Sequence, residues 1–171
     1  MTSKVDAGAR SEVDHLRQGL FLDDVNEGDN LPELSIPLTR TVIVATAIAS
    51  RDYQDVHHDP GLAVERGSDD IFMNILTTNG FVGRYVTDWA GPSAIITDVS
   101  IRLGAPNYPG DVMVLSGRVT SVSRQGQEEG SRRGATLDEP NRRGSVEVTI
   151  RGANSRGDHV TGAVWLTLPV R

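Results

Sequence analysis

Apolar residues along the chain follow two periods, one typical of strands and one typical of a long helix. The run from Thr41 to Ile48 (TVIVATAI) is rich in β-branched residues and alternates two sets of apolar positions, which predicts a buried strand. From Ile71 to Trp89, apolar residues recur at helical spacing. Ala90-Gly91-Pro92 ends this predicted helix, and Ser68 and Asp69 are available to cap its start.

The predicted long helix is weak by composition. Its interior contains several poor helix formers: Thr77, Thr78, Asn79, Gly80 and Gly83. Tertiary contacts must hold such a helix, so we expect it to lie embedded against a sheet. The two glycines, three residues apart, are expected to allow close backbone approach on one face.

Short polar connections separate the elements. Between residues 50 and 67 we expect a short helix, with Asp59 as its N-cap, Pro60 at its first position and Gly67 after its end. After the long helix, β-branched residues and alternation predict strands only, divided by turns that contain Gly or Pro or both. These predicted strands span residues 94–103, 111–123, 145–153 and 159–168.

One strand, one long buried helix and a run of antiparallel strands predict an α+β protein with a single hotdog fold, in which a curled antiparallel sheet wraps a long central helix. We expect the hotdog domain over 28–171 and an N-terminal arm over 1–27. Within the domain, 124–143 is polar and almost neutral, which predicts a mobile, solvated loop. Its two Arg-Arg-Gly repeats leave one alternative open, the binding of RNA or phosphate.

Composition narrows the classes of function. The chain has no cysteine, which excludes disulfides, thiolate metal sites and cysteine nucleophiles. Its formal net charge of −6 argues against a nucleic-acid partner, which would need a basic face. No run of about 18 apolar residues occurs, so we expect no membrane span. The polar, acidic start differs from a signal peptide, and a cytoplasmic protein is expected.

Most of the candidate chemistry falls between residues 50 and 60, where three acids and two histidines lie within eleven residues. This segment follows a predicted core element, where a scaffold can aim side chains at a pocket. Asp52 and His57 are five residues apart in a loop that leads into a helix, so both side chains can converge on one small molecule such as water. A carboxylate and an imidazole together make a water-activating pair.

Each of these residues also has a purely structural interpretation. Buried Asp–His pairs are often only structural. Two adjacent histidines do not easily face one site, so we expect His58 to be structural or exposed. Asp59 is explained as a helix cap, and Asp55 as a turn or surface residue. The histidines lack the spacing of a metal site, and no metal is expected.

Two segments resemble one enzyme family. The segment from Ala49 to Ala63 (ASRDYQDVHHDPGLA) resembles the signature of the MaoC-like, R-hydratase type of hotdog enoyl-CoA hydratase, in which Asp and His are five residues apart. The segment from Gly83 to Gly91 (GRYVTDWAG) is similar to the end of that family's central helix. The resemblance covers residues 25–170 except the polar loop.

The resemblance implies that Asp52 and His57 activate a water, which adds to the β-carbon of an enoyl-CoA thioester, and that the same pair protonates the α-carbon. The enolate-like oxygen then needs hydrogen-bond donors, which the family takes from a His-Gly step at the start of its central helix. Asn74-Ile75 is the matching step here, so both residues are expected to bind substrate. Gln54 stands where the family usually has Asn, and it is also expected to bind substrate.

The segments RDYQDVHHD, DIFMNILT and RYVTDWAGPSA further resemble the small subunits of steroid side-chain hydratases of actinobacteria. This subgroup implies a steroid enoyl-CoA substrate from cholesterol-type side-chain degradation, and a second MaoC-like subunit in a two-plus-two heterotetramer. CoA is part of the substrate, so no cofactor is expected. Arg102 and Arg118 are candidates to hold its phosphates. Two alternatives stay open: a non-catalytic subunit that binds acyl-CoA and completes an active heteromer, and a hotdog thioesterase, whose carboxylate usually lies on the central helix.

Overall fold

The structure, a computed structural model, describes residues 19–124 and 142–171. Five antiparallel strands form one sheet in the order β1-β3-β4-β5-β2. The strands are β1 (Asn30–Pro37), β2 (Ile95–Leu103), β3 (Val112–Arg124), β4 (Arg143–Asn154) and β5 (Gly157–Pro169). The helical elements are η1 (Leu22–Asp24), α2 (Arg40–Ala49), η2 (Asp55–His57), α3 (Pro60–Glu65) and α4 (Ile75–Ala90).

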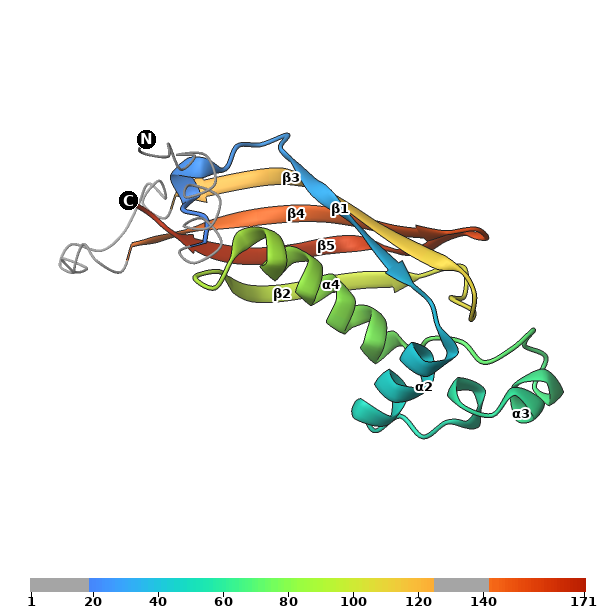
Figure 1. The fold of residues 1–171 in the computed structure, drawn as a ribbon. Helices are drawn as coiled ribbons and strands as arrows, with labels where there is room; N and C mark the ends of the chain where they lie inside the picture. The colour runs from blue at the N-terminus through green and yellow to red at the C-terminus, as the bar shows by residue number, and fades with distance from the viewer. Residues whose placement is uncertain (1–18, 125–141) are drawn as a thin grey trace, which may run out of the picture.

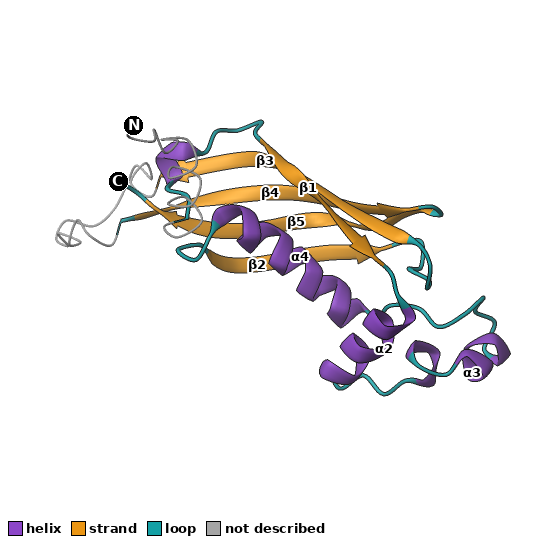
Figure 2. Ribbon diagram, in the orientation of Figure 1, coloured by secondary structure: helices purple, strands orange, loops and turns teal. Residues whose placement is uncertain are grey.

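The longest helix, α4, lies across one face of the sheet (Figure 1). The short helices α2 and α3 form a separate group beyond one end of the sheet, beside the end of α4 where Ile75 lies (Figure 2). One long helix on an antiparallel sheet confirms the predicted α+β hotdog class. The connection between β1 and α4, which contains these helices, therefore lies beyond one end of the sheet.

Burial holds α4 in place. Val82, Tyr85 and Val86 are at most 3% exposed and belong to the same apolar cluster as the strand residues Leu115 and Val148. This burial compensates for the low helix propensity of the segment. The predicted embedding of the helix against a sheet is confirmed.

The glycines of α4 behave differently from one another. Gly91, directly after the helix, has a φ of +82° and ends it as predicted. The expected close backbone approach at Gly80 and Gly83 is wrong. A Cβ added at Gly80 would meet no atom within 4 Å, and one added at Gly83 would meet only the Cδ1 of Ile96, at 4.0 Å.

The predicted start of α4 at Ile71 is also wrong. The N-cap is Asn74, whose side chain accepts a hydrogen bond of 2.9 Å from the Thr77 N–H, and not one of the two residues expected to cap the helix. Just before it, the Met73 N–H donates to the Asn107 carbonyl. The chain is therefore not helical from Ile71 to Met73, and it is hydrogen-bonded there to the connection between β2 and β3.

The strand predicted over 41–48 is wrong, because the segment forms α2. Thr39 caps this helix by accepting a hydrogen bond from the Val42 N–H. Its buried residues, Ile43 and Ala47, are four apart and so share one helix face. A run that is apolar at nearly every position fits both periods, and here tertiary contacts override the strand propensity of its β-branched residues.

The first strand is instead β1, which the pattern did not predict. Leu31 and Ile36 are buried although they are an odd number of residues apart. The register with β3 shifts between Leu31 and Leu34, which is a bulge that changes the face of the following residues. The bulge and Pro32 within it hide the simple alternation by which a strand is recognised.

Most of the other predicted elements are confirmed. β2 to β5 cover the four predicted strand runs to within a few residues. In α3, the Asp59 side chain accepts from the Leu62 N–H, Pro60 is the first residue, and Gly67 follows the end with a φ of +88°. These are the three signals from which the helix was predicted.

Residues 19–27, from the arm expected over 1–27, pack against the sheet domain. Leu22 and Val25 are buried in the core, and the Leu20 N–H donates to the Ala90 carbonyl. The packed chain thus begins at or before Gly19, while 1–18 lie outside the described residues. Of the loop expected over 124–143, Arg124 and Arg143 belong to the facing ends of β3 and β4, and 125–141 lie outside the described residues.

Within the described ranges, no helix is both long and apolar enough to cross a membrane.

Candidate active site

Asp52 is positioned by the way α2 ends. The Asp52 N–H donates to the Ala47 carbonyl at 2.9 Å, and the Arg51 N–H donates to the Ile48 carbonyl at 3.0 Å. These two bonds make a Schellman motif, in which the residue after the C-cap adopts the left-handed conformation. Arg51 has a φ of +59°, and it is the non-glycine residue with positive φ in the described ranges. The motif fixes the backbone of Asp52 at the helix end.

Arg51→Gly is expected to raise the free energy of unfolding by about 0.5–1 kcal/mol. It removes a left-handed strain of about 1–2 kcal/mol, and greater freedom of the unfolded glycine offsets part of that gain. Urea unfolding of the purified protein measures the change. Arg51→Ala keeps the strain and removes the side chain. A glycine variant less stable than the alanine variant by about 0.5–1 kcal/mol, the entropic cost of glycine alone, would show that the backbone at position 51 is not strained.

His57 lies at the end of η2 and is held by the segment before α4. Its Nδ1 lies 2.7 Å from the Phe72 carbonyl oxygen, and the Phe72 ring meets the imidazole edge to face at 5.0 Å between centroids. A carbonyl oxygen only accepts, so Nδ1 carries a hydrogen. In the neutral ring, Nε2 is then the unprotonated nitrogen. The backbone before α4 thereby selects the form of His57 that can accept a proton at Nε2.

The two predicted catalytic side chains come together. The Nε2 atom of His57 lies 3.4 Å from Oδ2 of Asp52, and the side chains are 7% and 17% exposed. The pKa of Asp52 is lowered, mainly by a hydrogen bond from the Asn74 side chain, with smaller contributions from the Gln54 N–H and from His57; partial burial opposes them. Asp52 is therefore an ionised carboxylate at neutral pH.

Asn74 links this pair to the central helix. Its Nδ2 donates to Asp52 Oδ2 at 3.0 Å and to Ser50 Oγ at 2.9 Å, while its Oδ1 accepts from the Thr77 N–H. Asn74 is 2% exposed, so these bonds are shielded from water. One amide both caps α4 and holds the carboxylate. The cap leaves the N–H groups of Ile75 and Leu76 without a partner inside the helix.

Asn74→Ser is expected to raise the pKa of Asp52 toward its ordinary value, because serine can still cap α4 but cannot reach the carboxylate. NMR titration of the Asp52 carboxyl carbon measures this shift. The direction of this pKa shift also determines how the stability of the fold depends on pH. A lowered carboxyl pKa stabilises the fold above the ordinary pKa, and this contribution is lost as pH falls through the folded-state pKa.

The Asn74→Ser variant should therefore lose part of the folding stability that the lowered pKa of Asp52 contributes at neutral pH. Asn79→Ser, an exposed asparagine on the same helix, is the control and should leave the Asp52 titration unchanged. An unchanged titration in Asn74→Ser would refute the role of the amide.

The other residues predicted for substrate binding are placed as follows. The Gln54 side chain is exposed, and its N–H points at Asp52 Oδ1 at 3.4 Å. Ile75 is the first residue of α4 and is 49% exposed beside the pair. Arg102 lies near the end of β2 that leads toward Asn107, whereas Arg118 pairs with Asn30 at the end of β1 farther from α2.

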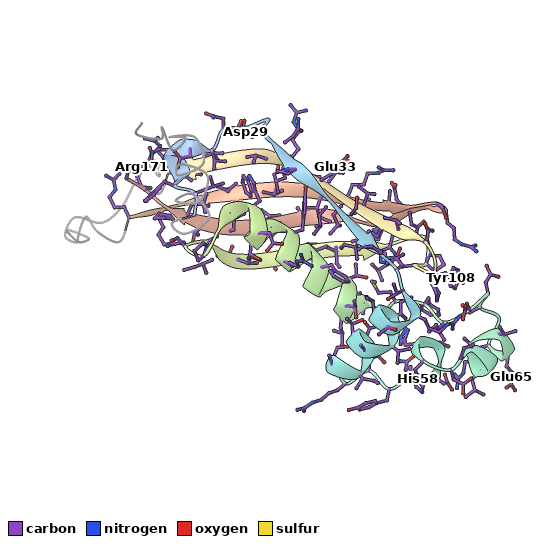
Figure 3. All side chains as sticks on the ribbon, in the orientation of Figure 1. Asp29, Glu33, His58, Glu65, Tyr108 and Arg171 are labelled. Carbon is purple, nitrogen blue, oxygen red and sulfur yellow. The ribbon has the colours of Figure 1, made fainter. Side chains whose placement is uncertain are left out.

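Two of the remaining polar residues in the segment have structural partners, as expected. The Asp55 carboxylate accepts a hydrogen bond of 2.7 Å from Arg66, and Asp59 caps α3. His58 is exposed (Figure 3). No group of three or more His, Cys, Asp or Glu side chains that could hold a metal ion occurs over 19–124 and 142–171.

Sequence reasoning missed two contributors to the site. Ser50 accepts from Asn74 and donates to the Thr46 carbonyl at 2.8 Å, so it joins the end of α2 to α4. Its place two residues before Asp52 was the available signal. The Phe72 carbonyl, which orients His57, is a backbone group and leaves no mark on the residue pattern.

No family model matches the chain. A curated relative is the 3-oxo-4,17-pregnadiene-20-carboxyl-CoA hydratase beta subunit of Mycobacterium tuberculosis (strain ATCC 25618 / H37Rv). It is 47% identical to this chain over 141 residues, which are 82% of this chain and 95% of the relative.

Solved structures of related proteins match the fold of this chain. A chain of the ChsH1-ChsH2 complex from Mycobacterium tuberculosis matches with a TM-score of 0.69 and 46% identity, over 84% of this chain and 98% of that chain. The MaoC-like dehydratase from Rhodospirillum rubrum matches with a TM-score of 0.69 at 20% identity, over 90% of this chain and 99% of that chain, and so supports the fold alone. The chain belongs to the MaoC-like family of hotdog hydratases.

Proposed function

We propose that this chain is the catalytic subunit of an enoyl-CoA hydratase that adds water across the α,β-double bond of a steroid side-chain thioester. In this proposal Asp52 and His57 are the catalytic pair, and Asn74, Ile75 and Gln54 contact substrate. The reaction changes no oxidation state overall and takes CoA as part of the substrate, so it requires no cofactor.

The geometry of the pair carries the proposal. Asp52 Oδ2 is an ionised acceptor. In the neutral form of the imidazole, His57 Nε2 is a second acceptor 3.4 Å away. Two acceptors repel each other at this distance unless a donor lies between or beside them. One water can donate a hydrogen to each, which leaves its oxygen lone pair free to attack.

The proposed reaction proceeds in two proton transfers. The water oxygen forms a bond to the β-carbon while His57 Nε2 takes one of its protons, and the electron pair of the double bond moves toward the thioester oxygen. The same pair then returns a proton to the α-carbon, and the thioester carbonyl re-forms. One water is consumed, with its hydroxyl on the β-carbon and a hydrogen on the α-carbon.

The start of α4 is suited to the charge that develops on the thioester oxygen. The N–H groups of Ile75 and Leu76 have no partner inside the helix, and the helix dipole adds to their positive potential. The thioesterase alternative needs a carboxylate on this helix. The acid that α4 does contain, Asp88, is 58% exposed and accepts a hydrogen bond from Arg84 on the surface.

The substrate class rests on the curated relative. That protein is named for a CoA thioester of a pregnadiene-20-carboxylate with a double bond at position 17. In such a thioester, C20 is the α-carbon and C17 is the β-carbon, so hydration places a hydroxyl on C17. At 47% identity over most of both chains, we assign the same class of steroid enoyl-CoA to this chain.

A second MaoC-like subunit is part of the proposal. β2 lies at an edge of the sheet, none of its nine residues is fully buried, and Ile95 is 54% exposed. An edge strand with apolar exposure is suited to pairing with another chain. The related chain was solved in a ChsH1-ChsH2 complex. We propose that the partner continues the sheet along β2, in a two-plus-two heterotetramer.

The test measures the loss of enoyl-thioester absorbance. It is run once with this chain alone and once with this chain co-expressed with the second MaoC-like subunit. A steroid enoyl-CoA and crotonyl-CoA are compared. Turnover of the steroid thioester that requires the partner supports the proposal in full. Absence of turnover with either substrate in every pairing would overturn it and leave a non-catalytic binding subunit.

A further inference from the structure

A groove of about 370 Å³ runs between α2 and α4 on the surface. The end of α2 forms one wall with Thr46, Ala49 and Ser50, and the first turns of α4 form the other with Leu76, Gly80 and Phe81. We call this feature the α2–α4 groove. Its volume falls in the range of small-molecule sites, about 300–1,000 Å³.

The α2–α4 groove adjoins the catalytic pair. Ser50 and Thr77, which both line it, are the residues that hold Asn74: Ser50 Oγ accepts from the amide, and the Thr77 N–H donates to it. The same amide donates to Asp52 Oδ2 at 3.0 Å. One end of the groove is therefore a single hydrogen-bonded residue away from the reacting carboxylate.

The walls of the groove are suited to an apolar ligand. Ala49, Leu76 and Phe81 present hydrocarbon, and Leu76 is 49% exposed. The charged lining residue, Arg84, forms an ion pair with Asp88. Covering these walls with an apolar group would remove hydrocarbon surface from water, which contributes about 25 cal/mol per Å².

Gly80 has no structural explanation other than the space it leaves. It lies inside α4 and is not among the residues with positive φ. A Cβ placed there would meet no atom within 4 Å. Alanine would fit and would make the helix more stable by about 0.5–1 kcal/mol. The effect of glycine at this position is to widen the groove.

We propose that the α2–α4 groove holds the apolar body of the acyl group, beyond its reacting carbons, and that Gly80 and Ala49 set how bulky that body can be. This inference rests on the proposed hydratase function. It assigns to this chain a share of substrate selection, through the face of α4 that is turned away from the sheet.

The experiment narrows the groove from both walls in the co-expressed complex. Gly80→Phe and Ala49→Phe each place a ring in the groove from an exposed backbone position, and Gly80→Ala is the matched control. The kcat/KM is measured for the steroid enoyl-CoA and for the shortest linear enoyl-CoA that the unmodified complex hydrates. Each phenylalanine variant is expected to lower the steroid value about 10-fold or more, on the scale by which pocket contacts discriminate substrates. The linear value should stay within about two-fold.

The other outcomes distinguish a failure of the groove proposal from a failure of the proposed hydratase function. An equal fall for both substrates, or no fall for either, would overturn the groove proposal while leaving the hydratase function in place. Loss of the partner subunit from the purified variants would identify the groove as a subunit contact and overturn the proposal as well. An unmodified complex that hydrates neither thioester would overturn the proposed function, and the groove proposal with it.

Discussion

His57→Ala in the assembled protein is expected to lower the rate of hydration by about 10²–10⁴-fold, the usual contribution of an acid–base group. The variant removes the nitrogen that accepts the proton of the attacking water. Asp52→Asn is expected to cause a fall of the same order, since an amide cannot share that proton and is nearly the same size. The measurement is the initial loss of enoyl-thioester absorbance at saturating substrate.

The neighbouring histidine provides a control. His58 is exposed, so His58→Ala should leave the rate within about two-fold. Thermal melting of each variant separates chemistry from folding, because His57 is buried and its loss also removes the bond to the Phe72 carbonyl. Unchanged activity in Asp52→Asn and His57→Ala with unchanged melting would refute the catalytic assignment of the pair.

Gly162→Ala is expected to be the most destabilising single methyl addition in the sheet. Gly162 lies in β5, opposite Ile101 of the edge strand β2. A Cβ there would overlap the Ser100 carbonyl oxygen and lie 2.8 Å from the Ile101 Cα, so backbone would have to move. We expect a loss of about 1–3 kcal/mol, the scale of overpacking. Denaturant unfolding measures this loss.

Gly80→Ala is the opposite case, because its added methyl meets no atom within 4 Å. The same chemical change should therefore stabilise the protein at one position and destabilise it at the other. Equal effects at the two positions would show that β2 and β5 are not as close as the structure describes. Since β2 carries the proposed partner edge, the Gly162 variant should also weaken assembly with the second subunit.

The parts of the fold that could be predicted are those whose sequence signals are local. Asp59, Pro60 and Gly67 bound α3, and alternation located β2 to β5. The segment 40–49 could not be predicted, because a run that is apolar at nearly every position fits a strand and a helix equally. Burial of the face that Ile43 and Ala47 share, and not the strand propensity of the run, decides for a helix.

The candidate site likewise has parts that local sequence signals predict and parts that only tertiary contacts bring together. Asp52 and His57 could be proposed from spacing and chemistry, and the structure brings them together. The link between Asn74 and Asp52 could not be predicted, because they are 22 residues apart and meet only when α4 packs beside the end of α2. Asn74 was expected to bind substrate, and the structure adds a second role, because its side chain makes the contact that lowers the pKa of the carboxylate.

The open edge at β2 has a consequence for how the protein is produced. An edge strand of nine residues with one open side, an exposed Ile95 and no fully buried residue is a site at which identical chains can add to one another. Any excess of this subunit over its partner would leave that edge uncovered. Balanced synthesis of the two chains, as from one shared transcript, would then protect the cell from aggregates of the unpaired subunit. Expression of this chain alone is accordingly expected to yield less soluble protein than expression of the pair.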